Sequence, residues 1–494
     1  MSEHHEHEHH HGENCHHGCC NAMDRRDFLS MTSVGVSALA ASGGLLGLTS
    51  AVSAGETAPA AKPRVRAVFL RPDVERTWMG WPGACYDMSG RQAEFTKIMA
   101  EAAEKLGVQL EVSDQPISEM AGIDQLLAEC KQSPPDGVIV TVMSLHPNYW
   151  KHANKFAAEK GDVPTIIFSP MGTSFTGNLQ STRAAKKCYV AATQDHSWLA
   201  TGVKLLRTVW DMKTTRLAIC ITGGENRGDQ KLDVIGTTLH YIPLNRWTDE
   251  LAKQEVTAEV KALAAEFTKT AQKIVEPTPQ DVLNAAKNYF VAKRIMAADQ
   301  CQGISLHCLQ LVANRRVPCP PCMAWTKLND EGNVGCCECD WNAAISLRLC
   351  SLLTGRPGFM QDPAPNTING TLMGAHCSAP TKLRGFDQPG EPLILRSHSE
   401  SEMGVSPQVI WPIGEEVTVM KFDGPSKMIL GTGKVVTNID TPPCGGCRTS
   451  VEITLDGVED PRDSKGFHQL FVLGRHERLV QAYCQLSGIE VVHV

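Results

Sequence analysis

The sequence predicts an α/β protein in which two α/β units are followed by a mostly antiparallel β domain. From residue 64 the chain alternates short Val- and Ile-rich runs with amphipathic stretches, which is typical of a doubly wound parallel sheet. A second strand-and-helix unit begins near residue 216. After about residue 357, short alternating runs are separated by Gly and Pro, which indicates an antiparallel sandwich or a partly closed barrel. A chain of 494 residues is also too long for one ordinary core.

The individual elements follow from the same patterns. In the first unit we expect strands at 65–70, 108–112, 137–143 and 165–169, and helices at 92–106, 123–130 and 151–159. In the second we expect strands at 217–222 and 303–308, and helices at 253–275, 279–298 and 341–353. In the third we expect strands at 393–396, 417–422, 428–436, 450–454, 469–473 and 490–494, and a helix at 475–485.

These elements predict three domains behind an N-terminal extension. The predicted segments are a His/Cys-rich disordered tract at 1–22, an export signal at 23–54, a linker at 55–63, and domains at 64–212, 213–356 and 357–494.

The segment 23–54 has the features of a twin-arginine (Tat) signal. Arg25 and Arg26 precede a weakly apolar run, and small residues near Ala54 offer a cleavage site. We therefore expect an exported, periplasmic or extracytoplasmic protein that uses the Tat machinery and keeps no stable membrane anchor after cleavage. An N-terminal anchor helix is the alternative, and the protein would be cytoplasmic if the signal is not used.

The tract before the signal is dense in metal ligands. It carries His4, His5, His7, His9, His10, His11, His16 and His17, with Cys15, Cys19 and Cys20. Such a segment binds Zn²⁺, Ni²⁺ or copper. It is either a metal-capturing extension or lies upstream of a true start at Met23.

Composition narrows the class of partner. The formal net charge of −7 and a pI near 6.2 argue against nucleic acid or an anionic membrane surface as a partner. The 19 cysteines include the groups 319–322, 336–339 and 444–447. We expect most to be buried free thiols; disulfides or a structural zinc or redox pair are the alternatives.

Four residues near the boundary between the second and third domains are candidate metal ligands. They are Glu338, Asp362, His376 and His468. Two carboxylates with one or two imidazoles suit Mn²⁺, Fe²⁺, Co²⁺ or Mg²⁺ better than a thiophilic ion. Strand alternation around Glu338 predicts that the neighbouring Cys337 and Cys339 point to the opposite face. Each candidate also has a structural interpretation, as a helix N-terminal charge, a turn residue or a core histidine.

Four stretches carry a resemblance to a known family. They are the segment 321–344 with its Cys-Glu-Cys-Asp-Trp, the Phe-Met-Gln-Asp that ends at 362, the segment 366–380 with Gly-Ala-His-Cys-Ser-Ala-Pro, and the segment 466–490 with Gly-Phe-His. Together they resemble the L-fucose isomerase / L-arabinose isomerase family. The resemblance covers 64–494 and is strongest from about 319.

The resemblance implies two Rossmann-like domains, a C-terminal β domain and a site between the second and third. It places metal ligands on Glu338, Asp362 and His468, and in the arabinose branch on His376. Gln361 stands where the arabinose branch has a carboxylate, so the site is closer to the fucose branch. Phe467 replaces a residue that is often polar. The family also implies a homo-oligomer.

The function expected from this resemblance is metal-dependent aldose–ketose isomerisation of a deoxyhexose or pentose, with Mn²⁺ or another divalent cation. Glu338 and Asp362 would share binding and acid/base roles. Side chains that could grip sugar hydroxyls are Arg71, Arg76, His398, Glu400 and Arg448, although each could also be a solvated charge. The alternatives are an exported carbohydrate-binding protein without catalysis and a thiol-rich metal-handling protein.

Overall fold

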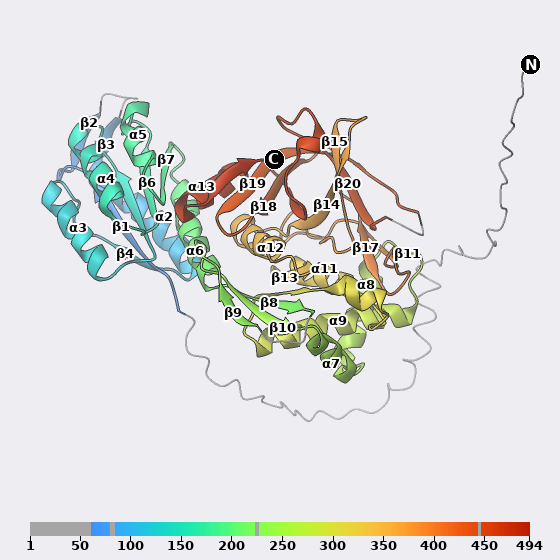
Figure 1. The fold of residues 1–494 in the computed structure, drawn as a ribbon. Helices are drawn as coiled ribbons and strands as arrows, with labels where there is room; N and C mark the ends of the chain where they lie inside the picture. The colour runs from blue at the N-terminus through green and yellow to red at the C-terminus, as the bar shows by residue number, and fades with distance from the viewer. Residues whose placement is uncertain (1–60, 80–83, 223–226, 443–445) are drawn as a thin grey trace, which may run out of the picture.

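The computed structural model describes residues 61–79, 84–222, 227–442 and 446–494. It is a mixed α/β structure with parallel sheet and a closed antiparallel β-barrel at the C-terminal end (Figure 1). The predicted His/Cys-rich tract, the export signal and residues 55–60 of the linker lie outside the described residues, as does Cys444. Within the described part of the chain, no helix is both long and apolar enough to cross a bilayer.

The first unit is built on a five-stranded parallel sheet in the order β4-β1-β5-β6-β7. Its strands are β1 (Arg64–Leu70), β4 (Gln109–Val112), β5 (Gly137–Val142), β6 (Thr165–Pro170) and β7 (Cys188–Thr193), and a hairpin of β2 (Arg76–Met79) and β3 (Ala84–Asp87) lies beside it. Its helices are α2 (Met88–Leu106), α3 (Met120–Gln132), α4 (Pro147–Glu159), α5 (Thr176–Arg183) and α6 (Trp198–Thr214). Separate apolar clusters join α2 and α6 to one face and α3 and α4 to the other. The fully buried β5 confirms the central strand predicted at 137–143.

The second unit contains the sheet β13-β12-β8-β10-β9, which is parallel except for β9. Its strands are β8 (Arg216–Ile221), β9 (Gly228–Lys231), β10 (Thr238–Pro243), β12 (Gly303–Leu306) and β13 (Val334–Cys337). Its helices are α7 (Asn245–Lys253), α8 (Ala258–Thr270), α9 (Pro279–Ala298), α10 (Cys308–Ala313), α11 (Cys322–Asp330) and α12 (Trp341–Thr354).

One helix prediction in this unit was wrong. The stretch 253–275 is not a single helix, because α7 ends at Lys253 and α8 begins after Thr257, whose side chain caps the new helix by accepting from the Val260 N–H. The end of the stretch is β11 (Lys273–Ile274), a short strand that pairs with a strand of the third unit.

The third unit is a closed barrel. The strands β14 (Phe359–Asn366), β15 (Thr371–His376), β18 (Glu416–Phe422), β19 (Lys427–Asn438), β20 (Thr449–Leu455) and β21 (Gln469–Leu473) form a ring that the β18–β19 pairing closes. β22 (Glu490–His493) joins β19 in parallel, and β16 (Leu393–Arg396) and β17 (Ser406–Val409) form a small sheet with β11. A short 3-10 turn spans Pro461–Asp463. The sequence predicted either a sandwich or a partly closed barrel, and the structure shows a barrel that is fully closed.

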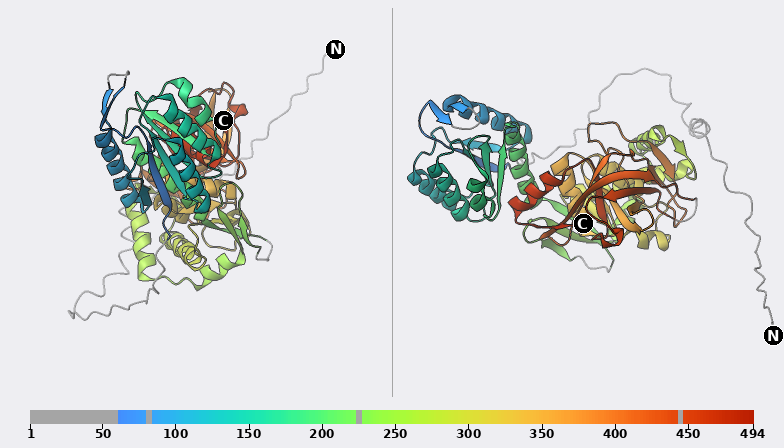
Figure 2. Two further views of the ribbon diagram at one scale, coloured as in Figure 1. Left: turned by 90° about the vertical axis from the view of Figure 1, so that its left-hand side faces the viewer. Right: turned by 90° about the horizontal axis from the view of Figure 1, so that it is seen from above.

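Two helices connect the three units. Helix α13 (Glu477–Ser487) follows the barrel and packs on α6 and β7 of the first unit, as Figures 1 and 2 show. Helix α12 packs against β13 on one side and against β18 and β21 of the barrel on the other. The N-terminal end of α12 is thereby held next to the ends of barrel strands, which is where the candidate ligands meet.

Candidate metal centre

Glu338 lies in a strained link between β13 and α12. The strand ends at Cys337, and Glu338 and Cys339 both have positive φ, at 62° and 57°. Left-handed backbone at non-glycine residues costs roughly 1–3 kcal/mol each and persists only where the surroundings enforce it. Asp340 then caps α12 by accepting a 3.0 Å hydrogen bond from the Ala343 N–H. The link turns the Glu338 carboxylate toward the barrel.

The barrel supplies the other three candidate ligands. Asp362 is on β14 and pairs with Ala375 of β15, while His376 is the last residue of β15. His468 immediately precedes β21 and also has a positive φ, 56°. Because β14 pairs with both β15 and β21, the pairing register brings the three residues to one end of the barrel.

The four side chains converge on one point. His468 Nε2 lies 3.4 Å from Glu338 Oε2 and 3.1 Å from Asp362 Oδ1, and His376 Nε2 lies 3.8 Å from Glu338 Oε1. One ligand atom from each of Glu338, His376 and His468 lies within 4.8 Å of the others. This buried Glu/His/His group can hold a metal ion, and its carboxylate and imidazole donors suit hard or borderline divalent cations.

Two atoms of the group have unused hydrogen-bonding capacity. Among the described residues, His468 Nε2 and Asp362 Oδ1 are both buried and have no hydrogen-bond partner, although they face each other. Leaving a buried polar atom unsatisfied costs about 1–3 kcal/mol. A cation bound between them would use both lone pairs, so the residues present fit a metal ion.

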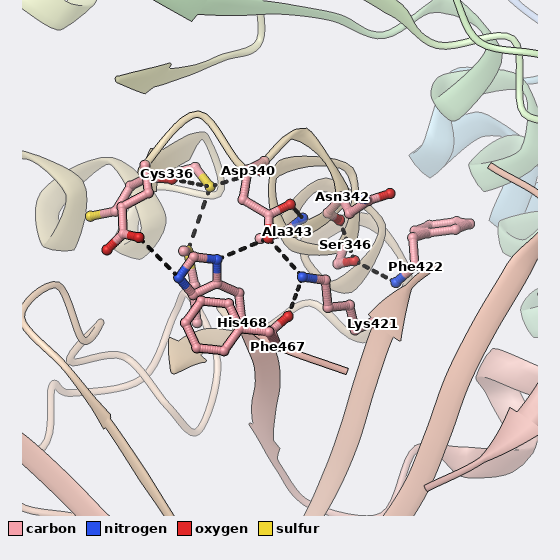
Figure 3. Close-up of polar contacts among 12 residues, drawn as sticks. Cys336, Asp340, Asn342, Ala343, Ser346, Lys421, Phe422, Phe467 and His468 are labelled. Carbon is pink, nitrogen blue, oxygen red and sulfur yellow. Dashed lines mark hydrogen bonds and ion pairs between the residues drawn. The ribbon is translucent and has the colours of Figure 1, made fainter. Parts of the chain in front are cut away.

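Asp340 belongs to the group around His468, although the sequence analysis did not single it out. Its Oδ2 accepts from His468 Nδ1 at 2.9 Å and from Lys421 Nζ at 2.7 Å, and Figure 3 shows it between the two. Lys421 also donates to the Phe467 carbonyl. A carboxylate on the second nitrogen of a ligating histidine fixes the ring orientation and the tautomer. The only signal in the sequence was the helix-capping position of Asp340 ahead of Trp341.

The electrostatics of the group follow from these contacts. Ionic contacts with the imidazoles of His376 and His468 hold the pKa of Glu338 far below its usual range. Burial alone lowers the pKa of His468, but the neighbouring carboxylates of Asp340, Asp362 and Glu338 outweigh it and raise that pKa to about 10. Burial would raise the pKa of Asp340, yet its bonds from His468 and Lys421 bring it down to about 2. Without a metal ion, the His468 proton therefore offsets the surrounding carboxylates.

Three of the four candidate ligands line a cavity of about 250 Å³, and His468 lies beside them. Its lining combines Glu338, Asp362, His376, His398 and Glu400 with Leu309, Val312, Pro320 and Phe467 and the cysteines 308, 322, 337, 377 and 447. The prediction that Cys337 points away from Glu338 was wrong, because the strand ends at Cys337 and the positive φ of Glu338 breaks the alternation. Cys339 does point elsewhere, and its thiol donates to the Cys220 carbonyl at 2.8 Å.

The predicted substrate-binding residues fall in different places. His398 lines the cavity. Arg448 is fully buried and donates to the backbone carbonyls of Ser397 and Pro442, each at 2.7 Å. Arg71 and Arg76 belong to the first unit, where Arg71 is buried and donates to Gln92 and two carbonyls, and Arg76 is exposed on β2. Of the five residues named from the sequence, only His398 and Glu400 line the cavity within one chain.

The thiols of the structure agree with the composition. The fourteen cysteines whose side chains are described are free, and twelve of them are buried, which confirms the prediction that most are buried free thiols.

No protein-family model matches this sequence, and no curated protein matches it either.

Proposed function

We propose that this protein is a metal-dependent aldose–ketose isomerase, similar to L-fucose isomerase, that acts on a deoxyhexose or pentose through an ene-diolate. The observation that carries the proposal is the convergence of Glu338, Asp362 and His468 on one point beside a cavity of about 250 Å³. Such a volume lies just below the roughly 300–1,000 Å³ typical of small-molecule sites, which suits a ligand as small as a single sugar. The proposal includes Mn²⁺ as the cofactor, with Mg²⁺, Fe²⁺ and Co²⁺ as alternatives.

The proposal extends to the fold and the biology. We assign the two parallel-sheet units to Rossmann-like domains and the site to the cleft between the second unit and the barrel. We further propose export through the twin-arginine signal and assembly into a homo-oligomer, in which Arg71 and Arg76 would serve the site of a neighbouring subunit.

Glu338, Asp362 and His468 would hold the divalent cation, which would supply Lewis-acid chemistry: it would acidify the C2 proton of an open-chain aldose and stabilise the negative charge that develops on the sugar oxygens. Glu338 and Asp362 are the acid/base pair. The low pKa of Glu338 keeps it ionised at neutral pH. One carboxylate accepts the C2 proton and returns it at C1, and the other moves the proton between O1 and O2.

The surrounding residues position this pair. Asp340 fixes the ring of His468, and Lys421 neutralises Asp340 so that its charge does not compete at the centre. Phe467 covers one side, with its ring centroid 4.2 Å from that of His468. Leu309 and Val312 add an apolar wall to the cavity, which limits the access of water to the reacting carbons.

The experiment that tests the proposal is ketose formation across a panel of aldoses. The purified full chain is stripped with a chelator and assayed before and after Mn²⁺ is restored, beside Glu338→Gln. Glu331→Gln is the matched control, because Glu331 is a partly exposed carboxylate that bonds to Tyr289 outside the cavity. Activity that returns with Mn²⁺ in the wild type and the control but not in Glu338→Gln supports the proposal. Sugar binding without ketose formation under every condition refutes it and favours the carbohydrate-binding alternative.

A further inference from the structure

The two histidines of the metal centre share one arrangement. Each turns its Nε2 toward the Glu338 carboxylate, at 3.4 Å for His468 and 3.8 Å for His376. The Nδ1 of His468 is held by Asp340 at 2.9 Å. The Nδ1 of His376 is held by the Ser378 hydroxyl at 3.2 Å. This hydroxyl therefore takes, at the second histidine, the place that a carboxylate takes at the first.

The Ser378 hydroxyl has a second partner, the Cys337 sulfur at 3.5 Å. Cys337 is the last residue of β13 and directly precedes Glu338, whereas Ser378 lies two residues after the end of β15. The hydroxyl thus links the second unit to the barrel at the point where two candidate ligands face each other. The three bonded side chains are buried, at 2% exposure for Cys337 and 5% for His376 and Ser378. Away from water such hydrogen bonds are electrostatically stronger than at the surface.

The segment that carries Ser378 is fixed by helix α11 of the second unit. Thr326 on this helix, which is 2% exposed, donates to the Ala379 carbonyl at 2.9 Å. Asp330, the last residue of the helix, accepts from the Thr381 N–H at 2.8 Å and from the Thr381 hydroxyl at 2.6 Å. Strand β15 on one side and helix α11 on the other therefore hold the serine in place, as a residue that positions a ligand requires.

The direction of the two hydrogen bonds decides what His376 can do. A serine hydroxyl has one proton to donate and lone pairs that accept. If it donates to Nδ1, the proton of the neutral ring lies on Nε2, which then has no lone pair for a cation. If the ring donates from Nδ1–H to the hydroxyl, and the hydroxyl donates to the Cys337 sulfur, Nε2 is free to ligate. Only this second arrangement lets His376 and Glu338 bind the same ion.

We infer that Ser378 is a positioning residue of the metal centre, whose hydroxyl holds His376 so that its Nε2 ligates together with Glu338. One ligand atom from each of Glu338, His376 and His468 lies within 4.8 Å of the others, so the oriented ring completes a compact set. Fixing one ring nitrogen while the other meets the ion is the usual arrangement at metal-bound histidines. The inference rests on the metal centre of the proposed function but not on the isomerisation, so metal binding is its readout.

The test is calorimetric titration of the full chain with Mn²⁺. Ser378→Ala should raise the Kd about tenfold, at the lower end of the roughly 10- to 100-fold typical of such partners, because a hydroxyl polarises the ring less than a carboxylate does. Ser351→Ala is the matched control, since Ser351 is a buried serine that donates to the Gly332 carbonyl at 2.9 Å outside the cavity. In a His376→Ala background, Ser378→Ala should have no further effect.

Pulsed EPR of the Mn²⁺ complexes supplies a signature that a loss of stability alone would not produce. The wild type should show one more coordinated imidazole nitrogen than His376→Ala, and Ser378→Ala should resemble His376→Ala. Signals from the His/Cys-rich tract are common to all these proteins and cancel in the comparison.

The outcomes separate this inference from the proposed function. A wild type that binds no divalent cation overturns both. A folded Ser378→Ala protein that binds Mn²⁺ within twofold of the wild type, or an equal loss of affinity in the His376→Ala background, overturns the inference and leaves the metal centre standing. Identical nitrogen signals in the wild type and His376→Ala overturn it as well, and this comparison requires no change at Ser378.

Discussion

Replacing Asp340 by Asn tests whether the carboxylate behind His468 supports the metal centre. The oxygen atoms of Asp340 accept from His468 Nδ1 at 2.9 Å, from Lys421 Nζ at 2.7 Å and from the Ala343 N–H at 3.0 Å. An asparagine can still cap α12, but it has no charge to pair with Lys421, whose side chain is 8% exposed. Loss of one partner of a buried ion pair costs about 3–5 kcal/mol. Since Lys421 still donates to the Phe467 carbonyl in the variant, we expect the free energy of unfolding to fall by about 3 kcal/mol, at the lower end of that range.

The same change should weaken metal binding. Removing the hydrogen-bond partner of a ligating histidine typically lowers metal affinity about 10- to 100-fold. Titration calorimetry with Mn²⁺ on the folded variant measures the loss. Asp229→Asn is the matched control, because Asp229 also pairs with a histidine and a cation, His240 and Arg216, at the surface of the second unit. A folded Asp340→Asn protein that binds Mn²⁺ within twofold of the wild type would show that this reasoning is wrong.

Three further predictions concern the pocket, the pH dependence and the packing. Phe467→Ala removes a ring that is 57% exposed and contacts His468. KM for the sugar should therefore rise roughly threefold to tenfold, measured by steady-state kinetics, while the Mn²⁺ affinity measured by calorimetry stays unchanged. Burial raises the pKa of Asp330 from 3.8 to about 6, so its contribution to stability is full below pH 4 and is lost as the pH rises through 6. Urea unfolding measures this: relative to Asp330→Asn, the free energy of unfolding of the wild type should rise by roughly 3 kcal/mol between pH 8 and pH 4. Plots of unfolding free energy against pH that run parallel for the two proteins would contradict this prediction. Gly335→Ala would place a Cβ 2.7 Å from the Trp325 Cα, so we expect a loss of roughly 1–3 kcal/mol and a lower melting temperature, and an unchanged melting curve would contradict it.

Much of the fold could be predicted because burial leaves a periodic pattern. Continuous Val/Ile runs such as 137–143 correspond to strands buried on both faces, and Gly355 ends α12 in the left-handed conformation that glycine favours. Barrel closure could not be predicted, since it requires β21 to pair with both β14 and β18, which lie far away in the sequence. The division of 253–275 into α8 and β11 likewise depends on β16, a partner strand that follows 121 residues later in the sequence.

The candidate site could be predicted in part. The sequence identified Glu338, Asp362, His376 and His468, because their residue types and the surrounding segments suggested a chemistry. It did not identify Asp340, whose role arises only when the barrel brings His468 to the cap of α12. It misplaced the side chain of Cys337 because strand alternation fails where the backbone turns left-handed. Contacts between distant segments and local strain are thus what sequence patterns omit.

The measurement that tests the central claim most directly is solvent deuterium uptake at C2 of the aldose, followed by NMR in ²H₂O. The full chain with Mn²⁺ is compared with the chelator-treated protein and with Glu338→Gln on a sugar that the panel shows to be bound. The account predicts deuterium incorporation that accompanies ketose formation and is lost in both comparisons. Ketose formation without any deuterium at the transferred position would point to a hydride shift, and binding with neither exchange nor ketose would contradict an isomerase centred on Glu338, Asp362 and His468.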